Sequence, residues 1–362
     1  MTHRRFVLPA LAAALLLAGG ARAADSALDS LKQESPELKS AGALAMGPAG
    51  ILLVGDPQAA AVYAIDTGDR TAPDSTKARP KVEGIDEKIA SLLGIEAKQL
   101  LIKSLAVNPL SGNTYLAVAR GRGPDAKPVL VRVARDGKLS ELNLKGAKYA
   151  MAKLPNPAEG RQRQDAITCL AYVKGRVFVA GLSNEEFSSN LRAIPFPFSD
   201  VNQGTNVGIF HGAHGRFETR SPVRTFTTMN IKGETHLLAA YTCTPLVKVP
   251  VAQLKAGEKV KGTTVAELGN RNVPLDMIVY KKDGKDYILM ANSSRGLMKI
   301  QTEGIDKVEA ITKRVADKAG LKYETIQGVK GVEQMDRFDR DHALVLLKTG
   351  TGSYNLDTIE LP

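Results

Sequence analysis

A unit of three short apolar strands recurs six times along the chain, and this repeat limits the possible folds more than any other feature. In each unit a tight polar turn joins the first two strands, and a small polar cluster follows the second. The first strands are marked by apolar residues 51 to 65 positions apart: Leu44, Leu105, Leu170, Phe226, Met277 and Met335. Repeats of about 40–50 residues with several strands each are typical of β-propellers.

The repeat predicts an all-β fold, a six-bladed β-propeller with short helical insertions at 85–93 and 311–319. Seven blades is the alternative, because the long stretches 66–100 and 186–222 have room for additional strands. A pair of β-sandwiches is less consistent with the same strand order repeated six times. Only 27 residues follow Met335, enough for three strands. We expect residues 37–41 to supply the missing outer strand and to close the ring.

The N-terminus has the pattern of a secretory signal peptide. Arg4 and Arg5 precede an apolar stretch of 13 residues, and Ala21-Arg22-Ala23 forms a small-x-small cleavage site. A spanning helix needs about 20 apolar residues, so we expect cleavage after Ala23 rather than stable membrane insertion. The predicted domains are a signal peptide at 1–23 and one propeller at 24–362, located in the periplasm or secreted. Cleavage removes three arginines and lowers the net charge from +11 to +8.

The two cysteines exclude a disulfide scaffold and a four-thiolate metal site. Cys169 and Cys243 are either a disulfide, which an oxidising compartment allows, or two free thiols. No phosphate-binding loop, HExxH motif or dinucleotide fingerprint is present. Sparse aromatic residues and export argue against nucleic-acid binding.

Polar side chains are predicted to gather on the propeller face that carries the loops between second and third strands and between blades. Binding residues collect on such loops. The surplus of arginine favours an anionic ligand, because a guanidinium pairs with carboxylate or phosphate through two hydrogen bonds; a solvated charged surface is the alternative. The candidate ligand-binding residues are Arg120, Arg122, Asn184, Glu185, Arg271, Asp276, Asn292 and Arg295. Arg161, Arg163 and Arg220 are expected on the same face.

Aligning the repeats also predicts a ring of residues around the central channel. It consists of the position before each apolar marker: Ala43, Ser104, Cys169, Thr225, Asp276 and Gln334. Asp276 is the one carboxylate in this ring, and a buried carboxylate needs donors or a cation. Backbone donors, Arg271 and a bound metal are the three possible partners.

His211 and His214 form an HxxH pair with Glu218 downstream. Imidazole suits zinc and copper, so this pair is a candidate metal site. Most catalytic sites need a third histidine, and the HGAHG run is also typical of a glycine-rich turn between outer strands, which is the alternative.

Three segments resemble secreted bacterial propellers of the broad NHL, YVTN and gluconolactonase (SMP-30-like) kind: LAVNPLSGNTYLAVARG, LAYVKGRVFVAGLSN and MIVYKKDGKDYILMANSSRG. The resemblance covers most of the mature chain. It implies a channel calcium held by glutamate and asparagine or aspartate, for which Asp276, Asn184 and Asn292 are the loose matches. Glu333 is the only glutamate near a matching position.

Two functions follow as hypotheses. The first is an exported binding protein whose basic face holds an anionic small molecule, a polysaccharide or an acidic periplasmic protein. The alternative is a metal-dependent hydrolase or lactonase with one divalent ion, calcium or zinc, at the channel.

Overall fold

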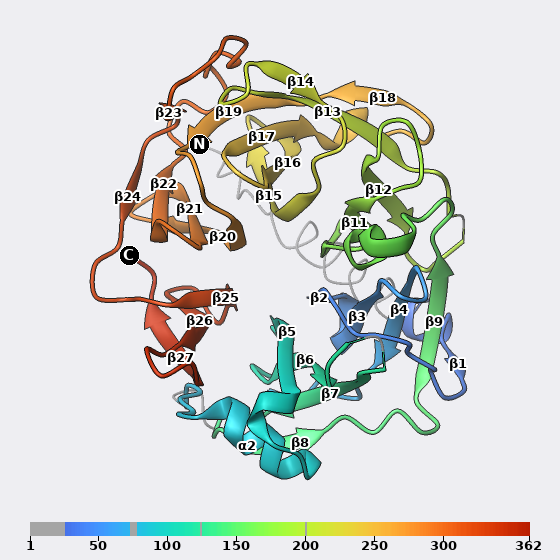
Figure 1. Cartoon of the computed structure of the whole chain (residues 1–362). Coiled ribbons are helices and arrows are strands. Elements are labelled where there is room, and N and C mark those ends of the chain that lie inside the picture. Colours follow the sequence, from blue (N-terminus) through green and yellow to red (C-terminus); the bar gives the residue numbers. More distant parts are fainter. Residues whose placement is uncertain (1–25, 73–77, 124, 200) are drawn as a thin grey trace, which may run out of the picture.

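Six β-sheets surround a central channel in the computed structural model, which describes residues 26–72, 78–123, 125–199 and 201–362 (Figure 1). The prediction of six blades is confirmed, and the alternative of seven is wrong. The predicted signal peptide lies outside the described residues. Within them, no helix is long and apolar enough to cross a membrane.

The blades are numbered I to VI in the chain order of their inner strands, and each runs outward from the channel. Blade I contains β2 (Leu44–Met46), β3 (Ile51–Asp56), β4 (Ala61–Asp66), β9 (Lys148–Lys153) and β1 (Lys32–Gln33). Blade II contains β5 (Leu100–Val107), β6 (Thr114–Arg120), β7 (Lys127–Val133) and β8 (Leu139–Glu141). Blade III contains β10 (Cys169–Val173), β11 (Arg176–Leu182), β12 (Ser189–Pro195), β13 (Thr205–His211), β14 (Arg216–Glu218) and β18 (Lys259–Lys261).

The remaining blades come from the C-terminal part of the chain. Blade IV contains β15 (Val223–Ile231), β16 (Glu234–Tyr241), β17 (Pro245–Pro250), β19 (Thr263–Leu268) and β23 (Lys318–Gly320). Blade V contains β20 (Pro274–Lys282), β21 (Lys285–Asn292), β22 (Gly296–Gln301) and β24 (Tyr323–Thr325). Blade VI contains β25 (Val332–Arg337), β26 (His342–Lys348) and β27 (Tyr354–Glu360). The helices are α2 (Ile85–Leu93), η1 (Pro48–Gly50), η2 (Ala97–Gln99), η3 (Gly160–Asp165) and η4 (Val251–Gln253).

The blades do not follow one another around the ring in chain order. Inner strand β2 contacts β5 on one side and β10 on the other, and β5 also contacts β25 (Figure 1). Blade II therefore lies between blades VI and I. After blade II the chain returns to blade I and adds β9 to its outer edge before it enters blade III. The apolar core agrees, because Ile51 of blade I packs with Val177 of blade III, whereas Leu116 of blade II packs with Leu344 of blade VI.

The ring is closed by the segment that precedes α2, not by residues 37–41 as the sequence predicts. Val82 forms an antiparallel bridge with Leu356 on the outer edge of β27, with N–H to O distances of 2.7 and 2.9 Å. Asp86 then accepts hydrogen bonds from the Ser353 hydroxyl and the Tyr354 backbone N–H. The unpaired edge of blade VI is thereby covered. Residues 39 and 40 instead lie against blade I, where Asp56 accepts their backbone N–H groups.

The long stretches between blades hold covering segments rather than a seventh blade. The helix predicted at 85–93 is present as α2 and ends at Gly94 in a left-handed conformation (φ 64°) that glycine adopts without strain. The helix predicted at 311–319 is absent. That segment runs along the outside of blade IV, where Ile311 donates to the Thr264 carbonyl, and it ends in β23.

Candidate functional site

The channel at the centre of the ring is a cavity of about 1000 Å³ lined by the inner strands of all six blades. Strands β2, β5, β10, β15, β20 and β25 all contribute side chains to its wall. This volume lies at the upper end of the range of small-molecule sites, about 300–1000 Å³. The channel is therefore the main candidate site.

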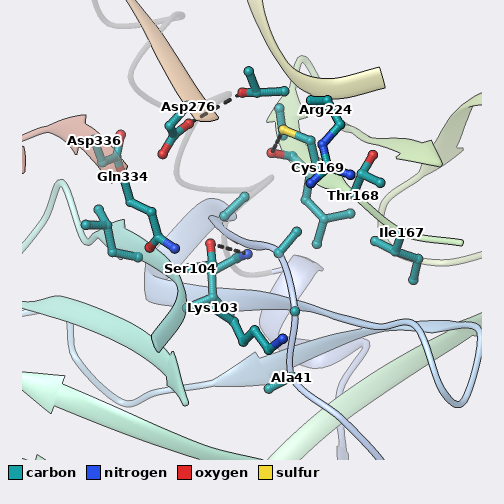
Figure 2. A pocket seen from close by; sticks show the side chains of 18 of the residues that line it. Ala41, Lys103, Ser104, Ile167, Thr168, Cys169, Arg224, Asp276, Gln334 and Asp336 are labelled. Carbon is teal, nitrogen blue, oxygen red and sulfur yellow. Dashed lines mark hydrogen bonds between the residues drawn. The ribbon is translucent and has the colours of Figure 1, made fainter. Parts of the chain in front are cut away.

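The ring of channel residues predicted from the repeat alignment is confirmed. All six line the cavity: Ala43, Ser104, Cys169, Thr225, Asp276 and Gln334. Figure 2 shows Ser104, Cys169, Asp276 and Gln334 around the same space, although they come from four different blades. Equivalent positions of equivalent strands face the channel because every inner strand has the same period of two.

A second ring of channel residues arises from β-bulges that the sequence does not reveal. Pairing with the second strand of the blade is interrupted at Lys103, Arg224, Leu275 and Glu333, each one residue before the predicted ring. A bulge places two residues opposite one and re-aims a side chain. As a result, Lys103 and Ser104 both line the cavity although they are adjacent in sequence.

Asp276 is held by hydrogen-bond donors from three blades. Oδ2 accepts the backbone N–H of Met335 at 2.9 Å, and Oδ1 accepts that of Met277 at 2.8 Å and the Thr225 hydroxyl at 3.4 Å. Burial raises the pKa of this carboxyl to about 7, against the opposing effect of the donors. Of the three partners considered from the sequence, backbone donors are the one observed; among the described contacts of Asp276, Arg271 is not a partner.

A second channel carboxylate, Asp336, does not belong to the ring that the repeat alignment predicts. It lies two residues beyond Gln334 on β25, and its Oδ2 accepts the Val107 backbone N–H at 2.8 Å. Burial raises its pKa to about 6. Asp276 and Asp336 thus join neighbouring blades, with much of their hydrogen-bonding capacity used by the backbone.

Cationic and acidic side chains both line the cavity: Lys103, Arg122, Arg224 and Arg337 on one hand, and Asp165, Asp276, Glu333 and Asp336 on the other. Lys103 and Arg122 are exposed to solvent, and we call the end of the channel where they lie its mouth. Arg224 has an acidic partner, Asp165, at 3.2 Å. Among the described residues, no carboxylate lies within salt-bridge distance of Lys103 or Arg122. The pKa of Lys103 is lowered, mainly by partial burial and in addition by the nearby positive charge of Arg122. The Arg122 guanidinium is oriented by a hydrogen bond from Nε to the Lys98 carbonyl at 2.9 Å.

Gln334 also lines the channel, and its side chain provides an amide with an unused acceptor. Its Oε1 is buried and has no hydrogen-bond partner in the described structure. A buried acceptor without a donor is costly unless a ligand or water satisfies it. The channel therefore combines cationic side chains at the mouth with an available amide inside.

The other residues selected from the sequence do not line the channel. Arg120, Arg271 and Asn184 are exposed on their blades. Glu185 accepts hydrogen bonds from Asn206 and Asn156. Asn292, the last residue of β21, is buried and donates to Asn272 in the segment before β20. Arg295 donates to the Asn270 carbonyl.

The predicted calcium ligands are therefore dispersed, since Asp276 lines the cavity and neither Asn184 nor Asn292 does. Glu333 does line it, but its carboxylate accepts a hydrogen bond from the Tyr354 hydroxyl at 3.0 Å.

The possible disulfide between Cys169 and Cys243 is not formed, and both residues are free thiols. Cys169 lies in the channel, where its thiol donates to the Phe226 carbonyl, whereas Cys243 lies at the loop between β16 and β17. Cys243 instead adjoins His211 and His214, and these three side chains could hold a metal ion. In the sequence, the hairpin of β15 and β16 lies between the histidine pair and Cys243. The contact between these residues across two blades therefore could not be predicted from the sequence.

Comparisons with known proteins add little to this geometry. No protein-family model and no curated protein matches the chain. Among solved structures, the chain is similar to a proposed oxidoreductase (glucose dehydrogenase) from Thermus thermophilus, at 14% identity and a TM-score of 0.36, covering 91% of this chain and 99% of that one.

It is also similar to the PQQ-bound aldose sugar dehydrogenase from Streptomyces coelicolor, at 14% identity and a TM-score of 0.35, with 91% and 96% coverage. A chain of the mitotic checkpoint complex matches at 7% identity and a TM-score of 0.35, with 91% and 93% coverage. These likenesses are too weak to say what this chain binds or catalyses.

Proposed function

We propose that this protein is an exported binding protein that holds a small carboxylate-bearing molecule in the central channel. The observation that carries the proposal is the pair of cationic side chains, Lys103 and Arg122, which line the channel mouth without a carboxylate partner among the described residues. Two like charges brought together repel each other, and an anion between them removes that repulsion. A carboxylate also matches the geometry of a guanidinium.

The cavity favours a small ligand over a large acidic partner. The space is enclosed by the six inner strands, and Gln334 within it offers an amide for a polar group of the ligand. In contrast, the arginines expected to form a broad basic face are distributed over separate loops, and Arg295 is engaged locally.

The test compares glucuronate with glucose by calorimetric titration of the mature protein at low salt. The two sugars share one ring, and only glucuronate carries a carboxylate. Glucuronate should bind, glucose should not, and the affinity should fall as ionic strength rises. Replacing Lys103 or Arg122 by alanine should weaken binding about tenfold to a hundredfold, because a hydrogen bond to a charged group is worth roughly 1.5–3 kcal/mol.

The matched control is Arg271→Ala, which removes an exposed arginine that does not line the channel. This variant should bind glucuronate like the wild type. Equal binding of the two sugars, or an equal loss in the Arg122 and Arg271 variants, would contradict the proposal.

A further inference from the structure

A second cluster of reactive side chains lies outside the channel, where blades III and IV meet. His211 ends β13, His214 follows in the turn before β14, and Cys243 lies between β16 and β17. One donor atom from each residue lies within 4.8 Å of the other two. We propose that His211, His214 and Cys243 bind one zinc ion, which joins blade III to blade IV.

Glu218 orients both imidazoles for this role. Its Oε2 lies 2.9 Å from His211 Nδ1, and its Oε1 lies 2.6 Å from His214 Nδ1. A carboxylate that accepts the Nδ1 proton of a histidine fixes the tautomer in which Nε2 carries the lone pair, as in many metal sites. One glutamate thereby prepares the Nε2 atoms of both histidines. Ser221 fixes Glu218 in turn through a hydrogen bond of 2.8 Å to Oε2.

His211 Nε2 now pairs with the buried Thr244 hydroxyl at 2.9 Å. That hydroxyl also interacts with Glu267, whose Oε2 is buried and has no hydrogen-bond partner in the described structure. When a metal takes the His211 lone pair, the Thr244 proton can turn to Glu267. Binding of a metal at Nε2 also requires the Thr244 oxygen, now 2.9 Å from Nε2, to move aside, and Glu267 is the neighbouring acceptor for its proton.

The backbone at Cys243 has the left-handed conformation, with φ 86°. This region favours glycine, and a residue with a side chain is strained there. A cysteine held in this conformation places its thiol beside two histidines. Access is open from one side, since the His214 side chain is 47% exposed while that of His211 is 2% exposed.

The donor set selects the class of metal. Two imidazoles and a thiolate suit zinc and its neighbours in the first transition row, whereas calcium takes oxygen ligands. Three protein ligands leave a fourth position of a tetrahedral ion for water.

The experiment uses the mature protein freed of metal and titrated with cobalt(II), followed by zinc. One equivalent of cobalt should produce a thiolate-to-cobalt charge-transfer absorption in the near ultraviolet, and zinc should abolish it by displacement. Zinc should also raise the thermal unfolding midpoint, because it binds only the folded chain. No binding near one equivalent, or cobalt binding without the thiolate absorption, would overturn the proposal.

Four variants identify the ligands. Cys243→Ser should lose the absorption and the zinc-dependent stabilisation, and His214→Ala should bind zinc at least tenfold more weakly. Glu218→Gln should weaken binding about tenfold to a hundredfold, as loss of an orienting carboxylate does. Cys169→Ser, which alters the channel cysteine, should behave as the wild type. Unfolding midpoints of the metal-free variants, measured in parallel, separate lost ligands from lost folding; a fully folded Cys243→Ser that keeps wild-type affinity would contradict the assignment.

Discussion

The Asp336 carboxylate accepts the backbone N–H of Val107 at 2.8 Å, across 229 residues of sequence. The bond joins blade VI to blade II, the two blades that meet where the ring closes. In related bonds a channel side chain of one blade also contacts the backbone of the next blade, always in the same direction around the ring from side chain to backbone. They are Leu44 N–H to Ser104 Oγ, Cys169 Sγ to the Phe226 carbonyl, and Met335 N–H to Asp276 Oδ2. The channel side chains therefore also hold the ring together by satisfying backbone groups at the edges of the inner strands.

The free energy of unfolding should depend on pH because of the buried carboxyl group of Asp276. Burial raises the pKa of its carboxyl in the folded protein from 3.8 to about 7, so the folded state binds this proton more tightly than the unfolded chain. Its contribution to the free energy of unfolding is therefore largest below about pH 4 and decreases as the pH rises toward 7, by on the order of 3 kcal/mol. Denaturant unfolding at several pH values between 4 and 8 measures this slope.

The comparison uses Asp276→Asn, which cannot take up the proton. This variant should show a shallower decrease of stability with pH than the wild type, whatever its absolute stability. Asp283→Asn is the control, because Asp283 is exposed in a hairpin turn at φ 50°, a conformation that asparagine tolerates. The assignment fails if all three proteins show the same slope.

The closure at Val82 should be sensitive to loss of one backbone N–H. Val82→Pro removes the donor to the Leu356 carbonyl at 2.7 Å, whereas Val82→Ala keeps it and loses only apolar packing. We expect the alanine variant to lose about 1–2 kcal/mol of unfolding free energy and the proline variant about 2 kcal/mol more. Equal losses measured by urea unfolding would show that the bridge does not contribute to closure.

The number of blades and one whole channel ring could be predicted from the sequence, because both depend on regularities that each repeat carries. The position before Leu105 faces the same channel as the position before Met277, since both strands pair in the same way. The bulge ring could not be predicted. One extra residue at Lys103 breaks the alternation of side chains, and no local composition marks it.

The order of the blades around the ring and the segment that closes it could not be predicted from the sequence either, for a different reason. Blade I takes its fourth strand, β9, from chain that follows blade II, and blade VI is covered by Val82, more than 250 residues earlier. Each repeat looks alike in sequence, so contacts between distant repeats leave no periodic signal. The same limit explains why the sequence does not place Cys243 beside His211.

Replacing Gln334 should affect ligand binding and protein stability in different ways. Its Oε1 is buried without a partner in the described structure, so Gln334→Leu should leave the free energy of unfolding unchanged or raise it by about 1 kcal/mol. The same change removes the amide that a ligand would meet inside the channel, and glucuronate binding should weaken about tenfold, the worth of one hydrogen bond. Urea unfolding and calorimetric titration of one protein preparation measure both effects. A variant that is destabilised while binding glucuronate normally would assign Gln334 a structural role and remove it from the ligand site.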